Sequence, residues 1–167
     1  GNISISSNKG LSLSNINYSM ITVLPYFKPA NSKIIDEDVT DIIETAKNKI
    51  WVTTTEYLLS NDLITKQTTI IRDLRKDFLQ STNYPMPMTL EKLDNGNIWV
   101  GYSGEGISVY NNTGRLLKKL DTTNGLPVNT LRVIKKMDDG SILVGAEKGL
   151  FKINSNTYAI DTFRNDQ

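Results

Sequence analysis

The chain has 167 residues, of which 38% are hydrophobic, with 19 lysine and arginine residues against 18 aspartate and glutamate residues. We expect a chain of this size and composition to form one soluble domain with its own core, and its balanced charge gives no electrostatic footprint for nucleic acid or an anionic membrane. It contains no cysteine and no histidine, which excludes disulfides, thiolate metal sites and Ser-His or Cys-His nucleophiles.

No stretch approaches the roughly 18 consecutive apolar residues of a membrane span, and the N-terminus lacks a charged region followed by an apolar core. We therefore expect any export or anchoring signal to lie outside this chain. The missing cysteines leave the compartment open, because disulfides are what would mark an oxidising one.

Four stretches along the chain follow one pattern, in which an apolar run is followed by a short turn and a second apolar run. They are "GNISISSNKGLSLS" from Gly1, "NKIWVTTTEYLLS" from Asn48, "GNIWVGYSGEGISVY" from Gly96 and "GSILVGAEKGLFKI" from Gly140. The equivalent positions Ser4, Trp51, Trp99 and Leu143 are 47, 48 and 44 residues apart. A period in the forties with several short strands per unit predicts β-propeller blades.

Each of the three later stretches is preceded by another short apolar segment, at 39–45, 88–93 and 129–137. We therefore predict an all-β fold of four-stranded antiparallel blades, about three and a half in number. The predicted segments are a partial blade at 1–35, a degenerate blade at 36–86, and blades at 87–127 and 128–167.

In the last unit the predicted strands are 131–137, 141–145, 150–153 and 158–163. Gly and Asn tolerate the positive φ of tight turns, so hairpin turns are expected at 94–96, 104–106, 138–140, 147–149 and 154–156. The residues expected to have structural roles in turns and blade packing are Trp51, Trp99, Gly96, Gly101, Gly106, Gly140, Gly145 and Gly149.

The second unit lacks the turn glycines, and the segment at 68–80 has apolar residues at 70, 71, 74 and 78. This spacing fits one face of an inserted helix, although a fourth strand with a long loop fits as well. Because repeats bury their faces only against neighbours, a count of three and a half leaves apolar ends exposed. We expect the chain to be part of a longer propeller, or to associate as a homodimer.

The stretches "LDNGNIWVGYSGEGISVYNNTG" and "NGLPVNTLRVIKKMDDGSILVGAEKGLFKIN" resemble the two-component regulator propeller repeat. Residues 87–163 carry most of the resemblance, while 38–60 match weakly and 1–15 match the second half of a unit. The sequence departs from the family pattern at its Trp position, where Ser4 and Leu143 stand, and at its Thr position, where Tyr102 and Ala146 stand.

The resemblance implies a periplasmic segment of the sensor region of a hybrid histidine kinase from bacteria that scavenge polysaccharides. On this interpretation the chain is a non-catalytic ligand sensor without a cofactor, and the ligand is a breakdown product of a poly- or oligosaccharide. The kinase, the membrane span and the control of transcription would belong to other parts of the parent protein.

Within such a blade, the turn between the second and third strands lies on the same edge as the connection into the next blade. Rings beside amides and carboxylates suit the faces and hydroxyls of sugars. The candidate ligand-binding residues on this edge are Tyr57, Tyr102, Glu105 and Asn129, and the alternative is an ordinary solvated rim. We predict no catalytic residue and no metal site, because the acidic residues at 36–44 lack the spacing of a calcium loop.

Two other functions compete with the sensor. One is a propeller that binds protein partners without any kinase. The other is a propeller lyase or hydrolase, which without histidine would have to use Glu, Tyr, Lys or Asp, or catalytic residues in other blades.

Overall fold

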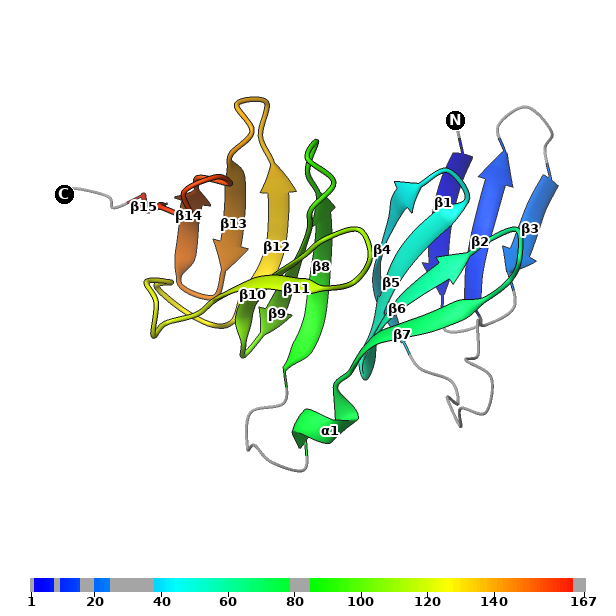
Figure 1. The fold of residues 1–167 in the computed structure, drawn as a ribbon, viewed down its shortest axis with the longest axis horizontal. Coiled ribbons are helices and arrows are strands. Elements are labelled where there is room, and N and C mark those ends of the chain that lie inside the picture. The colour runs from blue at the N-terminus through cyan, green and yellow to red at the C-terminus, as the bar shows by residue number, and fades with distance from the viewer. Residues whose placement is uncertain (1, 8–9, 16–19, 25–37, 79–84, 164–167) are drawn as a thin grey trace. The chain divides into compact units, whose positions relative to one another are not determined.

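The computed structural model describes residues 2–7, 10–15, 20–24, 38–78 and 85–163, the first three stretches as backbone only. They form four antiparallel sheets in chain order, in which every strand pairs with its neighbour in the sequence (Figure 1). By contacts the chain divides into two compact units, Gly1–Asp73 and Leu74–Gln167. The all-β prediction of four-stranded blades in a partial propeller is confirmed.

The first unit holds a three-stranded sheet and a four-stranded sheet. Blade 1 consists of β1 (Asn2–Ser7), β2 (Gly10–Asn15) and β3 (Met20–Leu24). Blade 2 consists of β4 (Val39–Ala46), β5 (Lys49–Thr54), β6 (Tyr57–Asp62) and β7 (Thr68–Asp73).

The second unit begins with a single helical turn, α1 (Arg75–Phe78), and then holds two four-stranded blades. Blade 3 consists of β8 (Met86–Lys92), β9 (Ile98–Ser103), β10 (Gly106–Tyr110) and β11 (Leu116–Leu120). Blade 4 consists of β12 (Leu131–Lys136), β13 (Ile142–Ala146), β14 (Gly149–Ile153) and β15 (Ile160–Thr162).

The helix predicted over 68–80 is wrong for its first half, where the alternative of a fourth strand is correct. Residues Thr68–Asp73 form β7 and pair with β6, for example Ile70 with Leu59. The four residues at 68–71 are all β-branched, and β-branched side chains favour the strand over the helix. Only Arg75–Phe78 is helical, and residues 79 and 80 lie outside the described residues.

Blades 3 and 4 share one hydrophobic core. Blade 3 contributes Trp99, Ile107, Val109 and Leu120, and blade 4 contributes Ile134, Val144, Phe151 and Ile153. All eight side chains are buried, and each such burial stabilises the fold by about 1.5–3 kcal/mol. Trp99 is therefore a packing residue between blades, and its ring lies 5.8 Å from that of Tyr158. Trp51 of blade 2 is also buried.

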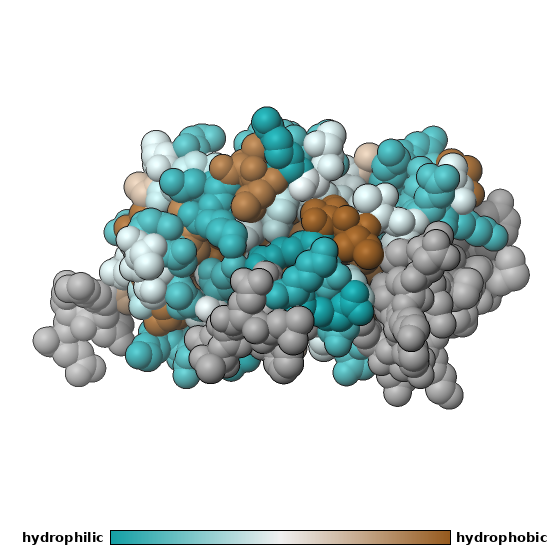
Figure 2. All heavy atoms as spheres, turned by 60° about the horizontal axis from the view of Figure 1, so that its bottom comes forward, coloured by the Kyte–Doolittle hydropathy of each residue, from teal (hydrophilic) through white to brown (hydrophobic). Residues whose placement is uncertain are grey.

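Blade 4 covers one face of the blade 3 sheet. The equivalent face of the blade 4 sheet is its outer face. The repeat aligns Leu150 with Ile107, yet Leu150 is 53% exposed and Ile107 only 1%. Val133 on the same face is 41% exposed. Among the described residues none covers this face as blade 4 covers blade 3. Elsewhere, in the view of Figure 2, hydrophobic residues form patches separated by hydrophilic ones.

Candidate functional site

The turn between β9 and β10 lies against the connection from β11 to β12, on the edge of blade 3 where the sequence predicted a ligand site. The carbonyl oxygen of Asn129 accepts hydrogen bonds from the N–H groups of Gly104 (3.0 Å) and Gly106 (2.9 Å). A β-bridge pairs Ser103 with Thr130. The structure therefore places Glu105, within this turn, close in space to Asn129.

The side chain of Asn129 holds the connection in its own shape. Its Oδ1 accepts a hydrogen bond from the N–H of Thr122 (2.9 Å), and its Nδ2 donates to the hydroxyl of the same threonine (3.2 Å). Both ends of the amide are thus engaged within the loop. The geometry shows that the Asn129 side chain closes the loop from Thr122 to Asn129. A role of Asn129 in ligand binding stays a prediction.

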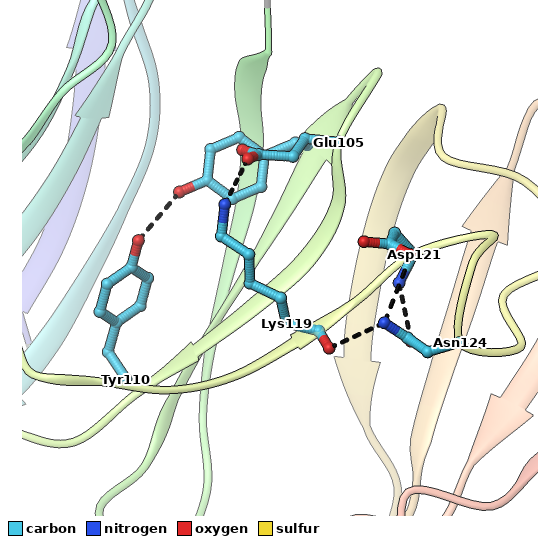
Figure 3. A network of polar contacts seen from close by, with 6 residues as sticks. Glu105, Tyr110, Lys119, Asp121 and Asn124 are labelled. Carbon is cyan, nitrogen blue, oxygen red and sulfur yellow. Dashed lines mark hydrogen bonds and ion pairs between the residues drawn. The ribbon is translucent and has the colours of Figure 1, made fainter. Parts of the chain in front are cut away.

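The same connection begins with a second polar cluster (Figure 3). Asp121 accepts hydrogen bonds from the hydroxyl and the N–H of Thr123, and these bonds hold the pKa of Asp121 below its ordinary value. Oδ1 of Asn124 accepts a hydrogen bond from the N–H of Asp121 (3.0 Å), and Nδ2 of Asn124 donates to the carbonyl oxygen of Lys119 (3.3 Å). The connection is therefore a tightly bonded loop.

Glu105 forms an ion pair with Lys119, whose Nζ lies 2.6 Å from Oε1 of the glutamate (Figure 3). The glutamate side chain is 24% exposed and the lysine side chain 44% exposed. A pair so open to water contributes at most about 1 kcal/mol to stability. A ligand at this carboxylate would have to share it with the lysine.

The two predicted tyrosines lie inside the blades, which corrects the expectation that they stand on the rim. Tyr57 and Tyr102 are both 0% exposed. Tyr57 begins β6 and Tyr102 belongs to β9, and a residue next to each of them in these strands is buried as well. The hydroxyl of Tyr102 lies 3.4 Å from that of Tyr110. Neither ring offers an exposed platform to a sugar, so their ligand-binding role stays a prediction.

A second candidate site lies at the opposite edge of blade 4. The β12–β13 turn and the β14–β15 turn border an open pocket of about 480 Å³, a volume typical of small-molecule sites. Its lining residues are Asp139, Gly140, Ser141, Lys152, Asn154, Ser155, Asn156, Ala159, Ile160 and Asp161. We refer to it as the blade 4 pocket.

Asp139 is the best anchored charged group of the blade 4 pocket. Its Oδ2 accepts a hydrogen bond from Nζ of Lys152 (2.6 Å), and its Oδ1 accepts from both the N–H and the hydroxyl of Ser141. Lys152 first, and then Ser141, hold the pKa of Asp139 well below its ordinary range. The carboxylate is therefore ionised at neutral pH and fixed in direction.

The β14–β15 turn is tied to the other side of the pocket. The hydroxyl of Ser155 donates to the carbonyl oxygen of Gly140 (2.6 Å). Oδ1 of Asn154 accepts from the N–H groups of Asn156 and Thr157 (3.0 and 2.9 Å), which makes an Asx turn. One hydrogen bond therefore joins the two turns, and two others shape the β14–β15 turn.

The sequence predicts turns at Asp139 and at 154–156, and it predicts no site role for Lys152 or Asp161. The signal that points to this pocket was present, because the first and third turns of a four-stranded meander lie on the same edge. What the sequence did not reveal was that the two turns leave a hollow between them.

Two other kinds of special site are absent from the described residues. They contain no group of three or more potential metal ligands, and no helix long and apolar enough to cross a membrane. Asp36 and Glu37, part of the acidic segment considered as a calcium loop, lie outside the described residues.

No known family model and no curated protein matches the sequence. Solved structures do match, among them the extracellular domain of a protein of B. thetaiotaomicron assigned to a hybrid two-component system. It is 25% identical, with a TM-score of 0.70, over 95% of this chain and 21% of that one. The extracellular domain of a B. thetaiotaomicron protein assigned to a one-component system is 21% identical, with a TM-score of 0.70, over 94% of this chain and 20% of that one.

The WD40 β-propeller domain of Doa1 is 16% identical, with a TM-score of 0.64, over 98% of this chain and 47% of that one. The chain spans about a fifth of the length of the two extracellular domains it matches. These likenesses establish the propeller fold.

Proposed function

We propose that this chain is a non-catalytic propeller segment of an extracytoplasmic sensor in a hybrid two-component system, responding to a breakdown product of a poly- or oligosaccharide. The observation that carries the proposal is the likeness to extracellular domains assigned to such systems, over 95% of this chain in one case. The motif resemblance to the two-component regulator propeller repeat points the same way.

The described polar edges agree with a hydroxyl-bearing ligand. The edge of blade 3 presents Glu105 and Lys119, and the blade 4 pocket presents carboxylates, amides and hydroxyls. Groups of these kinds exchange hydrogen bonds with sugars, since every sugar hydroxyl both donates and accepts.

Sensing requires that the ligand distinguish two arrangements of the parent protein, because a ligand shifts an equilibrium only by its difference in affinity for the two states. In the proposed sensor these arrangements are two arrangements of a propeller homodimer. The homodimer itself stays a prediction. Sedimentation velocity over a wide range of concentrations measures it directly.

The test begins with the complete reading frame that contains these residues. The sensor proposal expects further blades, a membrane span and a histidine kinase module in the same protein. The whole protein is then reconstituted in lipid vesicles, and its ATP-dependent autophosphorylation is measured with and without oligosaccharide pools prepared by partial digestion of polysaccharides.

A several-fold change in autophosphorylation with one pool supports the proposal. A reading frame without a membrane span or kinase contradicts it and favours a propeller that binds protein partners. A reading frame in which further blades bring together histidines and carboxylates favours the lyase or hydrolase instead.

A further inference from the structure

We propose that the blade 4 pocket binds a neutral sugar residue, held by Asp139, Asn156 and Asp161. The inference rests on the proposed function and names a location for its ligand. This location differs from the edge of blade 3 that the sequence favoured.

The pocket combines hydrogen-bond acceptors and donors on one surface. Asp161 and Asp139 supply carboxylate oxygens, which only accept, and Asn156 supplies an amide that does both. Lys152 gives one N–H to Asp139 and has two further N–H groups. Neighbouring hydroxyls of a sugar can donate to a carboxylate and accept from an amide or ammonium group at the same time.

Two of these side chains are open to a ligand. Within the described part of the chain, the side chains of Asn156 and Asp161 form no hydrogen bond, and both residues are exposed. Asp139 is engaged by Lys152 and Ser141 but keeps a side chain that is 56% exposed. Since each carboxylate oxygen accepts two hydrogen bonds, Oδ2 of Asp139 has room for a ligand hydroxyl.

The pocket is shaped before any ligand arrives. The bond from Ser155 to Gly140 joins the two turns, the Asx turn at Asn154 holds the backbone of Asn156, and Lys152 sets the direction of the Asp139 carboxylate. Groups that are already oriented lose less conformational freedom on binding. Ala159 and Ile160 add a small apolar wall for the C–H face of a sugar ring.

The charges select against other small ligands. Two carboxylates against one ammonium group, on Lys152, leave the pocket with a net negative charge, which repels phosphate and sugar acids. A divalent cation is disfavoured, because the described residues hold no group of three or more potential metal ligands and Lys152 already neutralises Asp139. A neutral ligand that is rich in hydroxyls fits best.

The experiment is a titration of the ¹⁵N-labelled 167-residue chain, followed by NMR, with D-glucose, D-galactose, D-mannose, D-xylose and maltose as probes. Inorganic phosphate and D-glucuronate serve as charged probes. The pocket lacks an aromatic ring, so we expect a Kd in the millimolar range, which corresponds to a free energy of binding of about −4 kcal/mol. Titration to about 50 mM sugar covers this range of Kd.

The proposal expects saturable shifts for at least one neutral sugar at the backbone amides of Ser141, Asn156 and Asp161. The variants Asn156→Ala and Asp161→Ala replace side chains that form no hydrogen bond within the described part of the chain. Each is expected to weaken this binding about tenfold, as the loss of a hydrogen bond of about 1.4 kcal/mol would. The matched control, Glu105→Gln on the edge of blade 3, is expected to leave it unchanged.

Three results would overturn the site. Saturable shifts at Gly104–Gly106 with none at the pocket would move the ligand to blade 3 and leave the sensor proposal standing. Tighter binding of phosphate or D-glucuronate would contradict a neutral ligand. No saturable shift with any sugar would remove the site, while the reading-frame test decides the sensor proposal separately.

Discussion

A Cβ atom added to Gly101 would lie 2.7 Å from Cγ2 of Thr89, closer than real Cβ contacts come. Thr89 is the register partner of Gly101 and directly follows the register shift between Pro87 and Thr89. The shift recurs between Leu131 and Val133, and there a Cβ on Gly145 would lie 2.7 Å from Cγ1 of Val133. At both positions glycine leaves room for a side chain of the first strand of the same blade.

We predict that Gly101→Ala destabilises the protein by about 1–3 kcal/mol, the usual cost of an overpacked core. Thr89 is only 4% exposed, and the added methyl would also meet Ile134 at 3.4 Å, so the neighbours have little room to move. Gly145→Ala is the matched comparison and is expected to cost less, because Val133 is 41% exposed and can turn aside. Urea unfolding measures both, and an equal loss would contradict this explanation.

Trp99→Ala is expected to destabilise the protein by about 3–5 kcal/mol, the cost of removing a large core side chain. Trp99 is fully buried between blades 3 and 4. Leu143, at the same position of the repeat in blade 4, is only half buried, and Leu143→Ala is expected to cost clearly less. Thermal or urea unfolding of the two variants compares them. A loss that is the same in both would show that the inter-blade core does not depend on Trp99.

The ion pair of Asp139 predicts a dependence on pH. Because the pKa of Asp139 is lower in the folded protein than in the unfolded chain, its stabilising effect is fully present above the unfolded value of about 4. It is lost as the pH falls from there through the folded pKa. Lys152→Met removes the largest cause, so the pKa of Asp139 is expected to rise towards its ordinary value.

The measurement is the carboxyl ¹³C shift of Asp139, followed by NMR from pH 6 down to about pH 2, with the amide spectrum recorded at each pH to follow folding. Lys119→Met, which breaks an ion pair of the other edge, serves as the control and is expected to leave the titration of Asp139 unchanged. If Asp139 in Lys152→Met stays ionised down to the same pH as in the unchanged protein, the ion pair with Lys152 does not set its pKa.

Asn129→Ala is expected to loosen the β11–β12 connection without unfolding the blades. The substitution removes both side-chain hydrogen bonds to Thr122, while the carbonyl oxygen of residue 129 can still accept from Gly104 and Gly106. A loss of about 1 kcal/mol is typical of such bonds. Hydrogen exchange at the amide of Thr122 is expected to be faster, with Asn156→Ala as the control that leaves it unchanged.

The sequence alone determined the repeat and with it most of the fold. Trp51, Trp99 and Leu143 recur at one position, and the turns around Gly96 and Gly140 separate strands whose observed ends lie within two residues of those predicted for the last unit. These features are local, since they depend on turn chemistry and on short runs of apolar residues.

Only the tertiary structure decided what the sequence left open between local alternatives. The segment at 68–80 offered both a helical apolar spacing and a β-branched run, and pairing with β6 selected the strand. Tyr57 and Tyr102 are buried because packing covers both faces of their strands, so that consecutive residues of β6 and β9 are buried alike. The blade 4 pocket lies where residues 139–141 and 152–161 come together at one edge of the sheet. Such a meeting depends on distances between turns, which no local pattern contains.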